Sequence, residues 1–139
     1  MKREDKELLL RDLCARLPYG IYGNYLNSDG SLSDDKLLRR VKIGYHDLIC
    51  ANGRDGMVLD GFLKPYLFPL SSMTEEQKRE YNSLRDFVPT YHYEFGDIVE
   101  DTELYDNFES IDYLNTHHFD YRGLIDKGLA IDATDLNIY

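Results

Sequence analysis

Histidines beside carboxylates are the residues of this chain whose types and spacing could support catalysis. His46 is followed directly by Asp47, and His92 lies two residues before Glu94. Each pair has the composition of a general acid–base pair, and alternation along a strand would place His92 and Glu94 on one face. No nucleophile or oxyanion donor can be tied to either pair in the sequence. We therefore interpret both as polar structural contacts and predict no catalytic residue.

A metal centre is the second chemistry that the sequence suggests. His117 and His118 are adjacent and are followed by Asp120. Adjacent residues on a helix point about 100° apart, so the two imidazoles cannot face one ion without distortion. An imidazole is favoured at a helix C-terminus, and we predict that position instead. Cys14 and Cys50 are too few for a metal knuckle or a disulfide framework, so buried or half-buried thiols, no metal and no cofactor are expected.

Catalytic signatures give no positive evidence for an enzyme. Residues 33–36 (Ser-Asp-Asp-Lys) match the SxxK pattern of penicillin-recognising enzymes, but they fall in a polar loop and no partner motif follows. We treat this match as chance. The patterns GxxxxGK[ST], GxGxxG, HExxH and GxSxG do not occur in the sequence. The sequence therefore favours a non-enzymatic protein.

Apolar spacing and turn residues predict an α+β fold for the elements that would position these side chains. A helix is expected over residues 4–17, because Leu9, Leu13 and Leu17 recur at four-residue spacing. The segment that follows is rich in glycine turn dipeptides, which favours a small, bent, barrel-like antiparallel sheet. Its strands are expected at 20–26, 37–44, 45–51 and 56–60.

Two prolines interrupt the apolar segment 62–70. Proline has no amide hydrogen to donate to a sheet and is largely confined to edge strands. We therefore predict that Pro65 and Pro69 make this segment a packed connector and not a central strand.

The remainder of the chain is predicted to be mainly helical, with two to three helices packed on the sheet. Thr74 with Gln77, or Ser72 with Glu75, has the spacing of a capping box, which begins a helix that ends near residue 86. The other expected elements are a strand at 91–95, an exposed loop at 100–107, a helix at 108–117 and a short helix at 121–127 capped by Asp120.

A single domain is expected for the 139 residues, with a helix-plus-β-rich half at 1–70 and an acidic, mainly helical half at 71–139. The sequence has neither the apolar stretch of a secretory signal nor the roughly 20 apolar residues of a membrane span. We therefore expect a cytoplasmic protein that does not enter a membrane.

Charge is distributed unevenly along the chain. The net charge is −10, yet residues 1–85 hold 14 Lys and Arg against 13 Asp and Glu. Residues 86–139 hold 2 Lys and Arg against 13 Asp and Glu. A surface this acidic repels a polyanion, so no direct nucleic-acid binding is expected despite the basic cluster at 39–42.

The acidic segment from residue 86 to residue 121 carries the main functional hypothesis. It contains ten carboxylates, no Lys or Arg, and nine Phe or Tyr. Carboxylates on a rigid surface imitate a row of phosphates, and tyrosines add contact area at low entropic cost. The expected partner is a protein with a basic surface, and the alternative is a solvated acidic face whose aromatics are core residues. The predicted protein-binding residues are Glu94, Asp97, Glu100, Asp101, Glu103, Tyr105 and Asp106.

A small ligand-binding domain is the alternative function, for instance one that sequesters a nucleotide. It would need a pocket with a few converging polar groups. The basic and aromatic residues that cluster in the sequence are Arg39, Arg40, Tyr45 and His46. We predict that they would form such a site where the sheet meets the helices.

Three segments of the chain are distinctive: LLLRDLCARLPYG (Leu8–Gly20), KPYLFPLSSMTEEQK (Lys64–Lys78) and IDYLNTHHFDYRGLIDKGLAIDA (Ile111–Ala133). They resemble a family of small uncharacterised proteins of gut Bacteroidetes, their phages and their mobile elements. Residues 21–63 and 89–107 depart from the family pattern. The resemblance implies a bacterial or phage cytoplasmic setting and an α+β fold, and it supplies no activity or catalytic residue. It favours an accessory protein that acts on a host or phage protein, including a host defence system.

Overall fold

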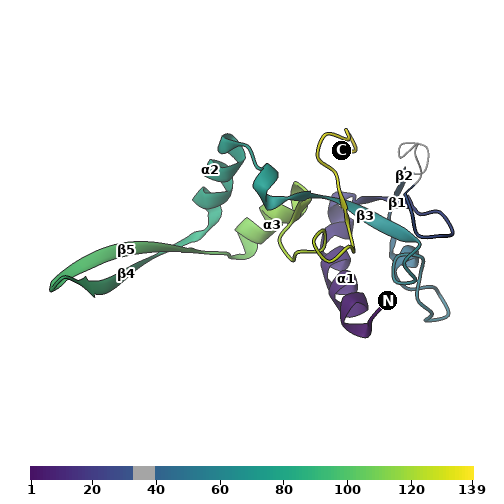
Figure 1. Ribbon diagram of the computed structural model, residues 1–139, viewed down its shortest axis with the longest axis horizontal. Coiled ribbons are helices and arrows are strands. Elements are labelled where there is room, and N and C mark those ends of the chain that lie inside the picture. Colours follow the sequence, from purple (N-terminus) through teal and green to yellow (C-terminus); the bar gives the residue numbers. More distant parts are fainter. Residues whose placement is uncertain (33–39) are drawn as a thin grey trace. The chain divides into compact units, whose positions relative to one another are not determined.

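The computed structural model describes residues 1–32 and 40–139, and its fold is α+β, as the sequence predicts. Contacts divide the chain into two compact units, Met1–Ser72 with Asn115–Tyr139, and Met73–Leu114. We call them the first and the second unit; the boundary at Leu114 falls inside helix α3. The elements, labelled in Figure 1, are α1 (Arg3–Arg16), a 3-10 turn (Leu17–Tyr19), β1 (Tyr22–Tyr25), β2 (Arg40–Lys42), a 3-10 turn (Tyr45–Asp47), β3 (Leu63–Pro69), a 3-10 turn (Leu70–Ser72), α2 (Glu75–Leu84), β4 (Asp86–Glu94), β5 (Asp97–Tyr105), α3 (Phe108–Thr116), β6 (Phe119–Asp120) and β7 (Ile131–Asp132).

Helix α1 of the first unit confirms the helix predicted at 4–17. Leu9 and Leu13, four residues apart, are both buried, and Glu4 lies in the first turn, where a carboxylate is favourable. Gly20, with a φ of 75°, ends the turn that follows the helix. Cys14 was expected to be a buried or half-buried thiol, but it is exposed.

The sheet of the first unit has the strand order β2-β1-β3-β6, with β7 also paired to β3. Strand β1 is antiparallel to β2 and β3, whereas β6 and β7 run parallel to β3. The sheet does not close into a barrel. Strands predicted at 45–51 and 56–60 are wrong: turns occupy this region. A Cβ on Gly56 would lie 2.3 Å from the carbonyl of Asp47, so the chain folds back on itself too closely for a regular ladder.

Strand β3 corrects the prediction that residues 62–70 form a connector. It is the central strand, and Pro65 pairs with Gly23 of β1. The amide of Leu26 donates to the carbonyl of Phe62, so by alternation Pro65 occupies a pair whose amides point away from β1. The β3 residues paired with β7 and β6 begin at Tyr66, one residue beyond Pro65. The proline therefore removes no ladder hydrogen bond.

The core of the first unit is formed by α1, the sheet, the turns between β2 and β3, and the segment after β6. Its buried apolar residues are Leu9, Leu13, Ile21, Ile43, Leu48, Val58, Leu59, Leu63, Leu67, Leu124, Leu129 and Ala130, and Tyr66, Ile131, Ala133 and Ile138 form a neighbouring cluster. The helix predicted at 121–127 is wrong. The carboxylate of Asp120 accepts the amides of Leu124 and Ile125, and Gly123 has a φ of 73°, which turns the backbone out of the helical region.

The second unit consists of α2, the β4–β5 hairpin and most of α3. The capping box of α2 is confirmed: the amide of Gln77 donates to Thr74, and the amide of Thr74 donates to the side chain of Gln77. The exposed loop predicted at 100–107 is wrong, because β5 pairs with β4 along nine residues. Residues 71–139 are consequently not mainly helical. In the described ranges, 1–32 and 40–139, no helix is long and apolar enough to cross a membrane.

Candidate functional site: a hairpin with two different faces

The β4–β5 hairpin is closed by a two-residue turn, Phe95-Gly96. Both residues have positive φ, 51° and 86°, which defines a type I′ turn. Pairing begins at Glu94↔Asp97 and continues without a break to Asp86↔Tyr105. In Figure 1 the two strands run side by side from the ends of α2 and α3 to this turn.

One face of the hairpin is acidic. Directly opposed residues of an antiparallel pair point to the same face, and successive residues alternate between faces. The face that we call the acidic face carries the side chains of Asp86, Val88, Thr90, His92, Glu94, Asp97, Val99, Asp101, Glu103 and Tyr105. His92 lies between two carboxylates, with Nε2 3.6 Å from Glu94 and Nδ1 3.7 Å from Asp101. The prediction that His92 and Glu94 share a face is confirmed.

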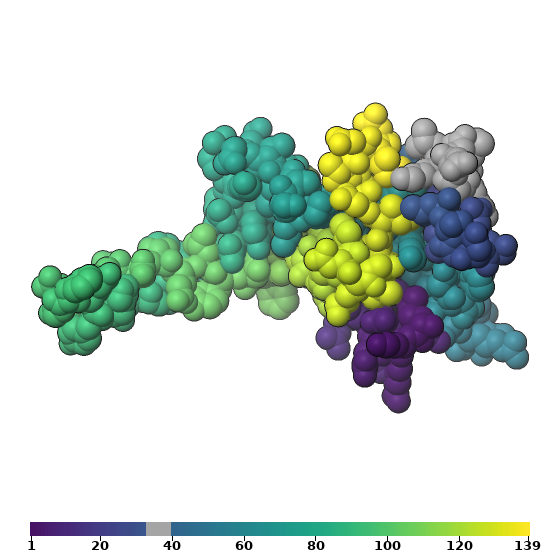
Figure 2. All heavy atoms as spheres, in the orientation of Figure 1, coloured from purple at the N-terminus to yellow at the C-terminus, as the bar shows by residue number. Residues whose placement is uncertain are grey.

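The opposite face is mainly apolar, and we call it the aromatic face. It carries Phe87, Pro89, Tyr91, Tyr93, Ile98, Glu100, Thr102 and Leu104. The side chains are largely uncovered: Phe87 is 63% exposed, Tyr91 66%, Tyr93 79% and Ile98 67%. Phe95 at the turn is 99% exposed. In Figure 2 the green spheres of the distal hairpin have no other element of the second unit over them on the face in view.

Polar side chains hold the root of the hairpin. Arg85 donates through Nη2 to the carbonyl of Leu104 at 2.9 Å, and its guanidinium lies 5.1 Å from the ring centre of Tyr81. Asp106 accepts hydrogen bonds from the hydroxyl groups of Tyr81 and Ser110 and lies 3.5 Å from Arg85 Nε. The root is thus fixed by ionic and hydrogen-bonded contacts.

Two stacked tyrosines complete this root. The rings of Tyr81 and Tyr113 are 6.3 Å apart with an interplanar angle of 22°. Burial, together with hydrogen bonds to Asp106 and Glu80 respectively, raises the pKa of each phenol to about 12. Both hydroxyls are therefore protonated at neutral pH and serve as hydrogen-bond donors to the carboxylates.

The seven residues predicted to bind a partner fall into three groups. Five lie on the acidic face: Glu94, Asp97, Asp101, Glu103 and Tyr105. Glu100 lies on the aromatic face, and Asp106 belongs to the root, where it is engaged by the contacts described above. Tyr105 also donates its hydroxyl to Glu103.

The aromatic face was missed as a separate feature by sequence reasoning. Alternation of Tyr91, Tyr93 and Phe95 was visible in the sequence. The common face of Tyr91 and Tyr93 with Ile98 and Leu104 depends on the pairing of β5, which the acidic segment 97–105 does not indicate by its own alternation. Recognition of Phe95-Gly96 as a turn would have supplied the register.

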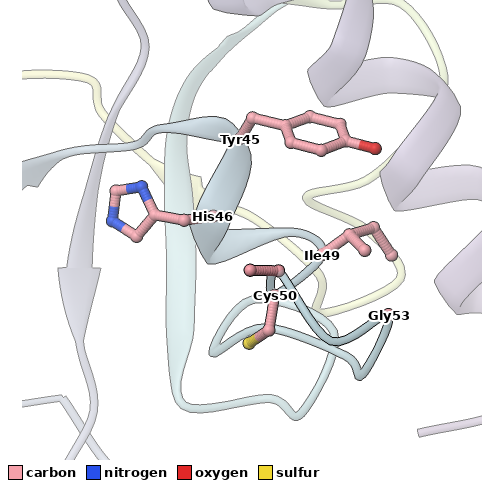
Figure 3. Close-up of a pocket in the computed structure, with 6 residues that line it drawn as sticks. Tyr45, His46, Ile49, Cys50 and Gly53 are labelled. Atoms are coloured by element: carbon pink, nitrogen blue, oxygen red, sulfur yellow. The ribbon is translucent and has the colours of Figure 1, made fainter.

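The predicted ligand-binding residues do not all converge. A cavity of about 450 Å³ is lined by Tyr45, His46, Ile49, Cys50, Ala51 and Gly53. Figure 3 shows the side chains of Tyr45 and His46 pointing to opposite sides of the 3-10 turn. Arg40 is engaged elsewhere: it donates to the carbonyl of Ile138 at 2.9 Å and stacks over Tyr22. Arg39 lies outside the described residues, as does the SxxK match at 33–36.

His118, two residues after the end of α3, packs within the first unit. His118 has a φ of 63°, and its ring stacks on Tyr139 with the ring centres 3.6 Å apart. Burial, with smaller contributions from Arg16 and His117, lowers the pKa of His118 to about 4.

In the described part of the chain, no group of three His, Cys, Asp or Glu side chains could hold a metal ion. The His46–Asp47 pair is 3.4 Å apart and its imidazole is exposed.

Comparison of the chain with models of protein families gave no match. Comparisons with curated proteins and with solved structures gave none either.

Proposed function

We propose that this protein is a non-enzymatic binding protein whose β4–β5 hairpin docks on a partner protein with a basic surface. The observation that supports the proposal is the hairpin itself, in which an uncovered aromatic face lies back to back with a face of five carboxylates. The resemblance of its sequence supports the further proposal that it is a phage or mobile-element accessory protein of the bacterial cytoplasm. The partners that we propose are host or phage proteins, including components of a host defence system.

A partner that covers this hairpin would be expected to stabilise it. A two-stranded hairpin is at best marginally stable alone in water, and exposed apolar patches on proteins mark interaction sites. Three Lys and Arg and twelve Asp and Glu lie within Met73–Leu114, for a net charge of −9. Such a field attracts a cationic partner over roughly a Debye length and selects against acidic ones.

The test is capture of partners from a host lysate by the tagged protein and by two charge-matched variants. The first variant, Asp97→Lys with Asp101→Lys, reverses charge on the acidic face. The second, Asp60→Lys with Asp126→Lys, makes the same change in net charge at exposed positions of the first unit. We expect a stoichiometric partner that the first variant loses and the second retains.

Salt provides the second readout of this experiment. Charge contacts at an exposed interface are screened over about 8 Å at physiological ionic strength, so the partner should elute as salt rises. Equal capture by the wild type and the acidic-face variant would refute the proposal. Circular dichroism of both variants would verify that each retains its secondary structure.

A further inference from the structure

The two edges of the hairpin differ in their capacity to pair with another strand. Residues of an antiparallel pair alternately direct their amides toward the partner strand and away from it. The closing pair of a two-residue turn, here Glu94↔Asp97, is hydrogen-bonded, so its neighbours direct their backbone groups outward. Alternation then places the outward-facing backbone groups at Phe87, Pro89, Tyr91 and Tyr93 of β4 and at Ile98, Glu100, Thr102 and Leu104 of β5.

Proline blocks one of these edges. Pro89 stands in the middle of the outward series of β4 and has no amide to donate, which is a device that natural sheets use to prevent strand addition. The opposed residue on β5 is Thr102, which retains its amide. Ile98, Glu100 and Thr102 thus offer an uninterrupted series of backbone groups, while the carbonyl of Leu104 is taken by Arg85. The sheet has two strands, so β5 is an edge.

A strand added along β5 would meet the two faces of the hairpin in alternation. Every second side chain of the added strand would lie beside Asp97, Val99, Asp101 and Glu103. The others would lie beside Ile98, Glu100 and Thr102 and extend the aromatic face. Charge complementarity therefore favours lysine or arginine at alternate positions, separated by apolar residues. A second copy of β5 would instead place carboxylates opposite carboxylates, which is unfavourable.

The turn residue supports the same conclusion. Phe95 adopts a left-handed conformation that is unfavourable for a bulky side chain, at a position where asparagine is preferred. Its ring is 99% exposed, so packing within the protein does not compensate for the strain. A strained and exposed aromatic residue at the tip of an open strand edge is an expected feature of a binding site.

We propose that the partner contributes an extended segment, with lysine or arginine alternating with apolar residues, that pairs with the outer edge of β5. This inference rests on the proposed function and specifies the chemistry of the partner. Main-chain hydrogen bonds to β5 would supply the docking register, and the alternating side chains would select the segment.

The probe is an acetylated, amidated peptide of four Lys-Val repeats, titrated into the full chain and followed by amide hydrogen exchange. We expect the peptide to slow exchange at Ile98, Glu100 and Thr102, and to leave Tyr91 and Tyr93 of the blocked edge unchanged. A peptide of four Glu-Val repeats should produce no protection. Protection confined to β4, or protection by both peptides alike, would overturn the inference.

Two single variants test the two edges separately: one adds a proline to the β5 edge and the other removes the proline from the β4 edge. Thr102→Pro removes one of the outward amides of the β5 edge, and Pro89→Thr restores one on β4. Because neither amide belongs to the internal ladder, both variants should keep the register of the hairpin. We expect Thr102→Pro to raise the peptide Kd by about tenfold or more, and Pro89→Thr to leave it within about twofold.

The outcomes separate this inference from the proposed function. If Thr102→Pro binds the peptide as tightly as the wild type while Asp97→Lys with Asp101→Lys does not, strand addition is refuted and acidic docking survives. If the acidic-face variant also captures its lysate partner normally, the proposed function itself fails. A concentration-dependent homodimer in sedimentation that Thr102→Pro abolishes would assign the edge to a second copy and overturn the partner chemistry stated here.

Discussion

The first and second units of this protein use aromatic and aliphatic residues in opposite ways. In the first unit, Leu13, Leu63 and Leu67 are fully buried, and the net charge is −1. In the second unit, Tyr91 and Tyr93 stand in solvent, and the net charge is −9. Burial of apolar side chains stabilises the first unit. The hairpin of the second unit depends on its turn and its polar root, which leaves its apolar side chains available to a partner.

The largest expected effect concerns a charge pair within the first unit. Asp12 is buried, with a 2.8 Å contact to buried Arg16 and a 3.3 Å contact to Arg122. Asp12→Ala would leave the guanidinium of Arg16 without its carboxylate, and we expect a loss of about 3–5 kcal/mol of unfolding free energy. Urea denaturation measures it. A loss below about 1 kcal/mol would contradict the assignment of this pair to the folded core.

The next effect compares truncation in the two units directly. Leu13→Ala should cost about 2–5 kcal/mol of unfolding free energy, because it leaves a cavity in the core. Tyr93→Ala, in a side chain that is 79% exposed, should cost less than about 0.5 kcal/mol. Urea denaturation of both variants measures the two losses of unfolding free energy. Similar losses for the two would remove the contrast between the units.

We also expect a group of the first unit, His118, to make the stability of the protein depend on pH. The pKa of His118 is about 4 in the folded protein, against an ordinary value near 6.5 in the unfolded chain. Between these values the unfolded state binds more protons, so stability falls as pH drops from about 6.5 to 4, by up to about 3 kcal/mol.

The variant His118→Asn isolates this contribution. Asparagine tolerates the left-handed backbone found at this position and does not titrate. Urea midpoints measured at pH 7, 5.5 and 4 should decline more steeply for the wild type than for the variant. Parallel declines would show that other groups, chiefly carboxylates, account for the acid sensitivity.

The smallest expected effect is a gain in stability. Phe95→Asn places a preferred residue in the first position of the type I′ turn and should stabilise the hairpin by up to about 1 kcal/mol. The same change removes the exposed ring, so partner binding should weaken while the hairpin becomes more stable. Hydrogen exchange of β4 and β5 measures the first effect and partner capture measures the second. A variant that is less stable would contradict the strain assigned to Phe95.

Local patterns in the sequence predicted the helices better than the sheet. Four-residue spacing of Leu9 and Leu13 identified α1, and the Thr74–Gln77 capping box identified α2, because both depend on neighbours within one turn. The prediction for β3 was wrong because of Pro65. A central strand tolerates this proline only when its position directs no amide toward β1, and that depends on the register and not on the sequence of the strand.

In the candidate site too, local features were predictable from the sequence and features that depend on strand pairing were not. Five of the seven predicted binding residues share the acidic face, because charge density is visible in the sequence. The aromatic face and the open β5 edge were not predicted, since both arise from pairing between two segments. Asp106 looked like its neighbours in the sequence, and only the fold assigns it to the root, through Tyr81 and Arg85.

The aromatic face provides the most direct test of the central claim, that the hairpin is exposed for binding and not for folding. Tyr91→Ser with Tyr93→Ser can be compared with the wild type in lysate capture and in urea denaturation. We predict loss of the captured partner with a change in unfolding free energy below about 1 kcal/mol. A variant that captures its partner as well as the wild type, or one that unfolds the second unit, would contradict the claim.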